Sequence, residues 1–284
     1  MTAQVAGGEY NVAIGNYVLA ALTSGDSNTS VGYNSGGALT TGTGNVLIGR
    51  DTGDALTDDG QSTLVGAYAG SQATVGQLTA LGYGALNGVT SGVRNTALGY
   101  DAGNSFDTED DNLFVGYAAG SGPVNGAEYN VGIGNYVLDA LTTADFITAV
   151  GYNAASSITT GGYNTFIGYG SGDAATDLDG NVGVGHDTLG SNVHGDRNTA
   201  VGYGALRTHT VASKSDVGNT AMGWAAGAEV TTGDGNTLIG HQAYATVSGN
   251  LTTGSSNVAI GMDLSLNTNS HSNSITIGAG IEGY

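Results

Sequence analysis

A short phrase, Asn-Thr-small-aliphatic-Gly, returns about every 17 residues from one end of the chain to the other. Two copies are Asn95–Gly99 and Asn198–Gly202. The closing glycine stands at residues 15, 32, 49, 66, 82, 99, 116, 134, 151, 168, 185, 202, 223, 240, 261 and 278. A fixed period of this length is typical of a solenoid, whose coils are stable because they stack on one another. The sequence therefore predicts one continuous repeat fold without an independent globular domain.

Composition narrows the class of solenoid. The 284 residues include 52 glycines, one proline and no cysteine, and only 10% are charged. Such a chain suits short strands separated by tight turns, so an all-β fold is predicted, with no disulfide and no thiolate metal site. The net charge is −19, with five basic residues. A surface of this charge repels phosphate backbones, so nucleic acid is not expected as a partner.

The N-terminal segment and the hydropathy pattern bear on localisation. Residues 1–8 contain neither a basic stretch nor an apolar stretch, so no secretory signal is predicted. No run of 18 apolar residues occurs, so membrane insertion is not expected either. We expect synthesis in the cytosol and, if the chain acts outside a cell, a route by lysis, particle assembly or a dedicated export apparatus.

The pattern within one coil predicts which residues face the core. We count each coil from its Asn, or the residue that replaces it, as position 1. Position 4 is always aliphatic or Met, as at Ile48 and Met222, and position 2 is Val, Ile, Leu or Thr. Alternation of this kind is typical of a strand with one face in a core, so positions 2 and 4 are predicted to point inward. Apolar residues at position 8, such as Ala102, and position 12, such as Leu39, predict a second inward-facing strand.

Position 3 lies between the two predicted core positions and is small or apolar in most coils, as at Ala13, Leu47 and Phe166. If positions 2 and 4 point inward, position 3 forms an outward stripe along the whole repeat. A stripe of this kind is a contact surface. We therefore expect a homo-oligomer, and a trimer is the oligomeric state that we favour.

Three further columns recur. Position 5 is always Gly, which predicts a positive φ or the close approach of another backbone. Position 1 is Asn in twelve coils, which predicts a ladder of side-chain amides. Position 6 is aromatic in half the coils, and these rings either pack along the solenoid or form platforms for sugar rings. The aromatic residues are Tyr33, Tyr83, Tyr100, Tyr117, Tyr152, Tyr169, Tyr203 and Trp224.

A longer repeat divides the chain. Residues 8–19 are nearly copied at 126–138, an offset of seven coils. The sequence thus predicts a short lead at 1–8, one block at 9–129 and a second at 130–284. Two coils of the second block are four residues longer than the rest, which predicts surface loops near 207–216 and 246–256.

The phrase at Asn198–Leu206, Asn-Thr-Ala-Val-Gly-Tyr-Gly-Ala-Leu, resembles repeats of bacteriophage tail fibres and related appendages. It is also similar to the head domain of trimeric autotransporter adhesins. The resemblance covers nearly the whole chain. It implies a left-handed parallel β-roll, here of about sixteen 17-residue coils, assembled as a trimer on a virion or outside a cell.

Candidate site residues fall into two groups. Acidic residues cluster in the turns that close two coils, and carboxylates in turns are ligands that Ca²⁺ uses, although solvated turn residues would look the same. These metal candidates are Asp107, Glu109, Asp110, Asp111, Asp177 and Asp179. The longer loop near 207–216 and the aromatic column give the receptor-contact candidates Arg207, His209, Lys214, Tyr203 and Trp224. No cofactor is expected, and Ca²⁺ stands only as the alternative to solvated turn carboxylates.

The function predicted from these features is a non-enzymatic virion fibre or appendage, because no catalytic motif frames any Ser, His or Asp. Its expected partners are further copies of itself, other virion or appendage proteins and a glycan or protein of the host surface. A cellular surface adhesin exported by another route is the first alternative. An ice-binding solenoid is a second, suggested by Thr pairs such as 40–41 and 159–160.

Overall fold

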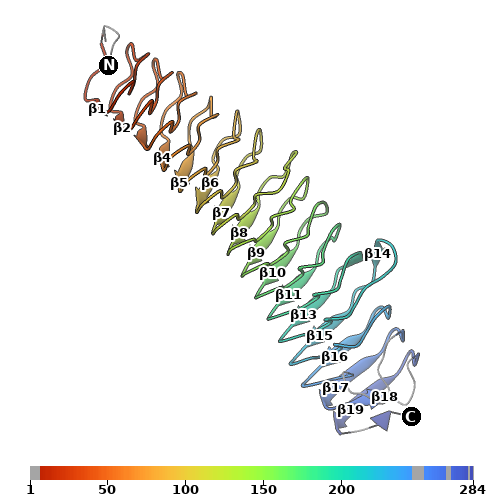
Figure 1. The fold of residues 1–284 in the computed structure, drawn as a ribbon. Coiled ribbons are helices and arrows are strands. Elements are labelled where there is room, and N and C mark those ends of the chain that lie inside the picture. The colour runs from red at the N-terminus through yellow and green to blue at the C-terminus, as the bar shows by residue number, and fades with distance from the viewer. Residues whose placement is uncertain (1–6, 245–252, 267–269, 281, 284) are drawn as a thin grey trace. The chain divides into compact units, whose positions relative to one another are not determined.

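The computed structural model describes residues 7–244, 253–266, 270–280 and 282–283 and divides the chain into two units, Met1–Thr143 and Ala144–Tyr284. Within its described residues each unit is all-β, without a helix, and forms a parallel β-solenoid of coils about 17 residues long (Figure 1). The predicted fold class is therefore confirmed, while the handedness and the trimer stay predictions. The sequence-block boundary at 129/130 falls inside unit 1.

Each coil contributes one short strand to a parallel sheet. In unit 1 these are β1 (Val12–Ile14), β2 (Thr29–Val31), β3 (Val46–Ile48), β4 (Thr63–Val65), β5 (Thr79–Leu81), β6 (Thr96–Leu98), β7 (Leu113–Val115) and β8 (Val131–Ile133). In unit 2 they are β9 (Thr148–Val150), β10 (Thr165–Ile167), β11 (Val182–Val184), β13 (Thr199–Val201), β15 (Thr220–Met222), β16 (Thr237–Ile239), β17 (Val258–Met262) and β19 (Ile275–Ala279). Four shorter strands form two additional pairs in unit 2, β12 (Gly195–Asp196) with β14 (Ser215–Asp216) and β18 (Ser265–Leu266) with β20 (Glu282–Gly283).

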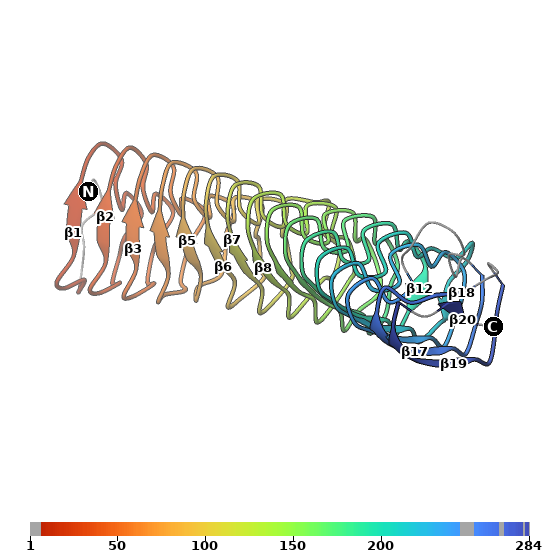
Figure 2. The same ribbon diagram turned by 90° about the horizontal axis from the view of Figure 1, so that it is seen from below.

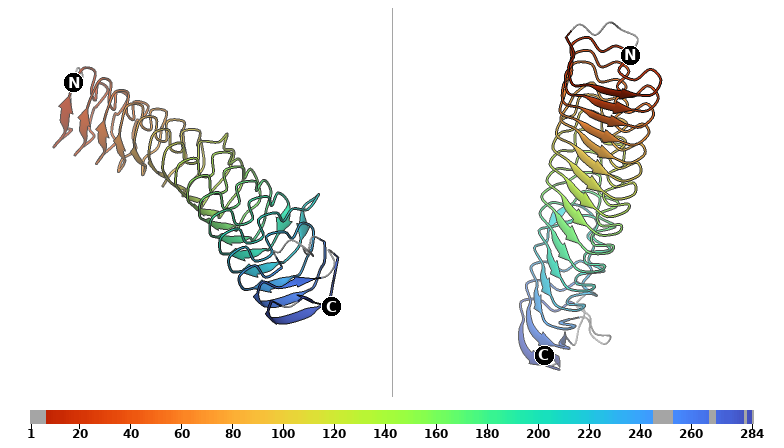
Figure 3. Two further views of the ribbon diagram at one scale, coloured as in Figure 1. Left: turned by 60° about the horizontal axis from the view of Figure 1, so that its bottom comes forward. Right: turned by 90° about the vertical axis from the view of Figure 1, so that its left-hand side faces the viewer.

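The register of the sheet follows coil length. Consecutive strands within each unit pair in parallel, as at Thr96↔Leu113, and stack along one side of the coils (Figures 2 and 3). Partners are 17 residues apart at most steps, but 21 apart at Thr199↔Thr220 and Thr237↔Val258. The extra residues thus leave the ladder as loops, without shifting the side-chain pattern. The loop near 207–216 is described, whereas residues 245–252 of the second loop lie outside the described residues.

The assignment of the strand faces was wrong. Position 3 points into the solenoid: Leu47 and Phe166 are fully buried, and only Ala13 of the first coil is half-buried. Positions 2 and 4 point outward, so that Ile14 is 60% and Met222 47% exposed. Strand side chains alternate between two faces, and here the outward face also carries an apolar column, because position 4 is aliphatic or Met while position 2 is Val, Ile, Leu or Thr. The outward stripe is therefore made by positions 2 and 4 and not by position 3.

Glycines create the room that the larger interior side chains need. A Cβ on Gly120 would lie 2.5 Å from Cε1 of Phe114, and a Cβ on Gly132 would lie 2.9 Å from its Cδ1. Phe166 has the same relation to Gly172, where the distance to Cε1 is 2.5 Å. A large residue at position 3 is thus matched by glycine in its own coil or the next, which keeps the narrow interior close-packed.

The predicted second strand is formed only in the last two coils, where β18 pairs with β20; in the other described coils its inward residues are buried but no strand forms. Ala102 at position 8 and Leu39 at position 12 are fully buried, as expected. The intervening residues form turns, because positions 7 and 9 adopt positive φ, as at Asp101 (φ 51°) and Leu86 (φ 52°). Left-handed residues interrupt an extended chain. The apolar spacing therefore identified core residues but not their backbone conformation.

Both reasons proposed for the invariant glycine at position 5 hold. Gly99 has a φ of +146°, and a Cβ built on it would lie 2.1 Å from the carbonyl oxygen of Gly116 in the next coil. Real Cβ atoms do not approach a backbone oxygen so closely, and residues that carry a Cβ rarely adopt this φ. The glycine column thus sets the corner at which each strand ends.

The asparagine ladder at position 1 is confirmed. Asn28 Nδ2 donates to Oδ1 of Asn11 at 3.2 Å, and Asn45 Nδ2 donates to Oδ1 of Asn28 at 3.0 Å. The same oxygens accept from the backbone N–H of Asn28 at 2.9 Å and of Asn45 at 3.0 Å. In unit 2 the ladder continues from Asn164 to Asn181 at 3.2 Å. Each amide satisfies buried backbone groups that the turn leaves unpaired.

Candidate functional site

The acidic cluster before β7 serves the stacking of coils. Glu109 is buried, and its Oε2 accepts from the backbone N–H groups of Asp107 at 2.7 Å and Thr108 at 3.0 Å, while its Oε1 accepts from the N–H of Gly126 at 2.7 Å. Asp107 accepts a hydrogen bond from the Thr90 hydroxyl. The carboxylate of Glu109 therefore holds its own turn and the following coil together.

The remaining carboxylates of this cluster also have protein partners. Asp110 Oδ1 accepts from the backbone N–H of Val93 at 2.7 Å. Asp111 forms a bidentate pair with Arg94, with Nε–Oδ1 at 2.6 Å and Nη2–Oδ2 at 2.8 Å. The hydrogen bond from Arg94 lowers the pKa of Asp111. A guanidinium in this place competes with any cation for the same oxygens.

The second predicted metal cluster, before β11, is similarly engaged. Asp177 Oδ1 lies 2.7 Å from Nδ1 of His194. Asp179 Oδ2 accepts from Nζ of Lys214 at 2.6 Å, and its Oδ1 accepts from the N–H of Gly162 at 2.7 Å. Among the described residues no three His, Asp or Glu side chains are placed to hold one metal ion. The geometry favours turn-stabilising carboxylates over a Ca²⁺ site.

His209 cannot serve as a surface contact, because it lies in the solenoid interior with no exposed side-chain area. It occupies position 12, where other coils carry Leu, Ile or Phe. Its Nε2 lies 3.2 Å from Nδ2 of Asn219, which also donates to the carbonyl of Gly233 at 2.8 Å. Burial lowers the pKa of His209 to about 4. Only the coil register, which places residue 209 at position 12, could have indicated its burial.

Lys214 lies in the longer loop and is bound to its own chain. Strand β14 of this loop pairs with β12 of the preceding coil, and the loop carries the Lys214 ammonium to Asp179, two coils back. The hydrogen bond to Asp179 raises the pKa of Lys214. This residue is therefore placed apart from the other receptor-contact candidates.

The aromatic column forms ladders of stacked, half-exposed rings. In unit 1, Tyr83 and Tyr100 stack with ring centroids 5.1 Å apart, and Tyr100 and Tyr117 with centroids 5.4 Å apart. In unit 2 the centroids of consecutive stacked rings lie 4.8–5.9 Å apart. The members of this second ladder are Tyr152, Tyr169, His186, Tyr203, Trp224 and His241. Stacking along the column is thus observed, and the outer part of each ring faces solvent.

Three receptor-contact candidates meet at one surface recess in unit 2. Tyr203, Trp224 and Arg207 all line it, together with Glu229 and Gln242. The Arg207 Nη2 atom lies 3.5 Å from Oε1 of Glu229. Sequence reasoning missed Glu229 and Gln242, since neither belongs to a recurring column. Only the register through the 21-residue coil, Thr199↔Thr220, brings Glu229 beside Arg207.

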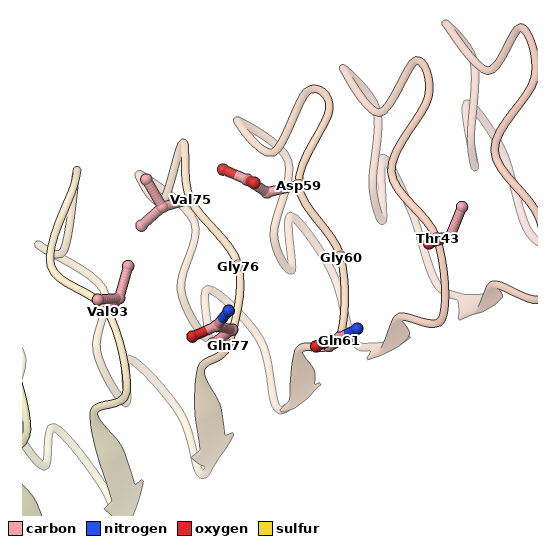
Figure 4. A pocket seen from close by; sticks show the side chains of 8 residues that line it. All are labelled: Thr43, Asp59, Gly60, Gln61, Val75, Gly76, Gln77 and Val93. Atoms are coloured by element: carbon pink, nitrogen blue, oxygen red, sulfur yellow. The ribbon is translucent and has the colours of Figure 1, made fainter.

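A second recess lies in unit 1, among the turns that precede β4, β5 and β6. Figure 4 shows the side chains of Asp59, Gln61, Val75 and Gln77 on successive turns around it. Gly60 and Gly76 expose backbone between them. The recess contains no aromatic ring and no basic group, so it offers fewer means of holding a ligand than the recess in unit 2.

Comparison of the chain with protein-family models, curated proteins and solved structures finds no match. In the ranges that the structure describes, no helix is long and apolar enough to cross a membrane. The recess beside Tyr203 and Trp224 is the candidate functional site, since it unites residues that the sequence had marked separately.

Proposed function

We propose that the protein is a non-enzymatic virion fibre or appendage that assembles as a homotrimeric rod and contacts a host surface. The observation that carries this proposal is the outward apolar face of the strands. In each unit every position 4 is aliphatic or Met, and Ile14, Leu81, Met222 and Ile277 are each more than two-fifths exposed. A continuous apolar face of this kind marks an interaction surface.

Further copies of the same chain would fit this face. The face repeats with the coil, so an identical partner presents an identical spacing of side chains. Full burial of a Val, Leu, Ile or Met side chain contributes about 1.5–3 kcal/mol. Several chains packed about a common axis would remove the whole stripe from water. The resemblance to trimeric phage fibres and adhesin heads supports three copies over two.

Light scattering on the purified chain tests the assembly. We expect a mass of three times 28.0 kDa. The double variant Ile167→Asp/Val201→Asp places charges on the strand face and should yield monomers or aggregates. The matched double variant Thr160→Asp/Ser191→Asp, in turns of the same unit, should remain trimeric. A folded wild-type monomer would refute the assembly.

Antibody labelling of particles and cells from the source tests the location. Label on projecting virion fibres is expected. Label confined to cell surfaces would instead support the adhesin alternative, which the same exposed strand face would also suit. The ice-binding alternative gains an outward Thr at position 2 in nine coils, but position 4 is never Thr, so the face lacks Thr at both outward sites of a strand.

A further inference from the structure

The recess in unit 2 forms where two consecutive coils carry unusually small residues. Position 7 follows the aromatic residue and is Asp or Asn in several coils, as at Asp101 and Asn153. In the two coils beside the recess it is Gly204 and Ala225, and Ala228 adds a third small residue to the lining. The surface is therefore hollowed beside the aromatic ladder rather than filled by a carboxylate or an amide.

The aromatic ladder is also most open at this level. The centroids of Tyr203 and Trp224 lie 5.9 Å apart, whereas the other steps of this ladder measure 4.8–5.5 Å. Trp224 is 46% exposed. Each step is set by the spacing of the coils, and this one spans the 21-residue coil. His241 stacks on the other face of Trp224 with centroids 4.9 Å apart, so the apolar surface that the recess offers is made by the exposed ring edges of Tyr203 and Trp224.

Polar groups complete the recess. Arg207 and Glu229 stand 3.5 Å apart with both side chains partly exposed. A surface pair of this kind contributes little to folding stability, and it leaves guanidinium donors and carboxylate acceptors directed to solvent. Gln242 adds an amide, which both donates and accepts. Arg207 is one of only five basic residues in a chain of net charge −19.

We propose that this recess binds a neutral saccharide unit of a surface glycan, an inference that rests on the attachment function proposed above. Apolar ring surface beside a few convergent polar groups is the usual composition of a small-ligand site. A sugar ring presents C–H groups on one face and hydroxyls at its edge, which suits the exposed ring edges of Tyr203 and Trp224 together with the polar Arg207–Glu229 pair. Glu229 and the acidic surface disfavour an anionic ligand. The recess also lies beyond the corner glycine, outside the strand face that the trimer would bury.

Trp224 is the only tryptophan of the chain, so its fluorescence reports directly on this recess. The intact protein is first applied to a printed array of neutral and acidic oligosaccharides and of peptides. Free oligosaccharides that bind are then titrated against Trp224 fluorescence. We expect neutral oligosaccharides to bind and to change the fluorescence.

Variants locate the site. Tyr203→Ala, Arg207→Ala and Glu229→Gln should each weaken binding by about tenfold or more. Tyr100→Ala is the matched control, because Tyr100 has the same ladder position in unit 1 but is followed by Asp101; it should bind as wild type. Trp224→Phe keeps a ring in the ladder and should still bind on the array.

Absence of oligosaccharide binding, binding confined to acidic glycans or peptides, or binding that all the recess variants retain would overturn the proposal. If the protein is still trimeric and virion-borne in that case, only the saccharide site fails. A monomer, or a chain absent from particles, would instead refute the proposed function.

Discussion

The buried histidine gives the sharpest test of the interior. His209 has no exposed side-chain area, and among the described residues its Nδ1 has no hydrogen-bond partner. Burial lowers its pKa from 6.5 to about 4. The folded protein therefore holds a neutral imidazole at pH values where the unfolded chain has already taken up a proton.

The sign and size of the pH effect on the free energy of unfolding follow from the difference between the pKa values of His209 in the folded and unfolded states. Above pH 6.5 the imidazole is neutral in both states and does not affect the pH dependence of stability. As the pH falls from 6.5 towards 4, the unfolded chain binds one proton more than the folded protein, so the free energy of unfolding decreases. Because one pKa unit corresponds to about 1.36 kcal/mol, the loss is about 2 kcal/mol at pH 5 and about 3 kcal/mol at pH 4.

Two substitutions isolate this contribution from the titrating carboxylates. His209→Leu introduces the residue that Leu22 and Leu39 provide at the same coil position, and His209→Asn introduces the residue found at Asn192 in the preceding coil. Neither replacement titrates. Urea unfolding at about pH 7.5 and about pH 5 should show that wild type loses about 2 kcal/mol more than either variant. Protein concentration is held constant, since assembly contributes to apparent stability.

The two variants should differ from each other at neutral pH. Leucine fills an apolar site and removes the unpaired Nδ1, so His209→Leu is expected to be the more stable. Asn219 keeps its bond to the Gly233 carbonyl in both. If the free energy of unfolding decreases equally in wild type and in both variants between the two pH values, a buried, neutral His209 is refuted. Circular dichroism establishes that each variant is folded before the comparison.

Three further predictions concern the columns and the turns. Gly99→Ala should lower the free energy of unfolding by more than about 3 kcal/mol, because its Cβ would meet the Gly116 carbonyl. Gly44→Ala, at φ +70° with open space around it, should cost about 1 kcal/mol. Similar losses for the two variants would contradict the conclusion that contact with the next coil requires glycine at position 5. Asn28→Ala should cost about 2–3 kcal/mol in urea unfolding because it leaves the Gly42 carbonyl and the backbone N–H of Asn45 unpaired. Asn28→Ser should cost less, because Ser62 occupies the same coil position. Addition of EDTA should leave the melting temperature unchanged, and a fall on EDTA that Ca²⁺ reverses would restore the acidic turns as metal sites.

Much of the fold could be predicted because stacking makes each constraint recur. The invariant glycine at position 5 and the asparagine at position 1 are required by contacts between identical coils, so a single sequence displays each of them many times. The close approach of Gly99 to Gly116 is one example of the repeated glycine contact. The hydrogen bond from Asn28 to Asn11 is one example of the repeated asparagine contact. The absence of a second strand from most of the described coils could not be predicted in this way, since the left-handed residues at position 7 include Asp, Ala and Gln as well as Gly and Asn.

The candidate site was predicted only in part, because it depends on departures from the repeat. Tyr203 and Trp224 belong to a column, and Arg207 stood out as a rare base. Glu229 and Gln242 have no such mark, and their position depends on how the coil from Asn198 to Gly218 closes. His209 was assigned to the surface because an insertion usually forms an exposed loop, but the insertion begins after it.

The reversal of the strand faces has a physical cause that bears on assembly. Period-two alternation identifies a strand, yet it identifies the core face only when the other face is polar. Here the outward face also carries an apolar column, and the two faces differ in uniformity: outward position 4 is aliphatic or Met and position 2 is Val, Ile, Leu or Thr, while inward position 3 varies from Gly183 to Phe166. Variation in size belongs inside, where each side chain must fit glycines such as Gly172 and Gly183. A uniform column of β-branched residues instead builds an even surface. The outward stripe is therefore made by the aliphatic column at position 4 beside a column of Val, Ile, Leu and Thr at position 2, and an exposed apolar column of this length favours contact with another protein surface over solvent.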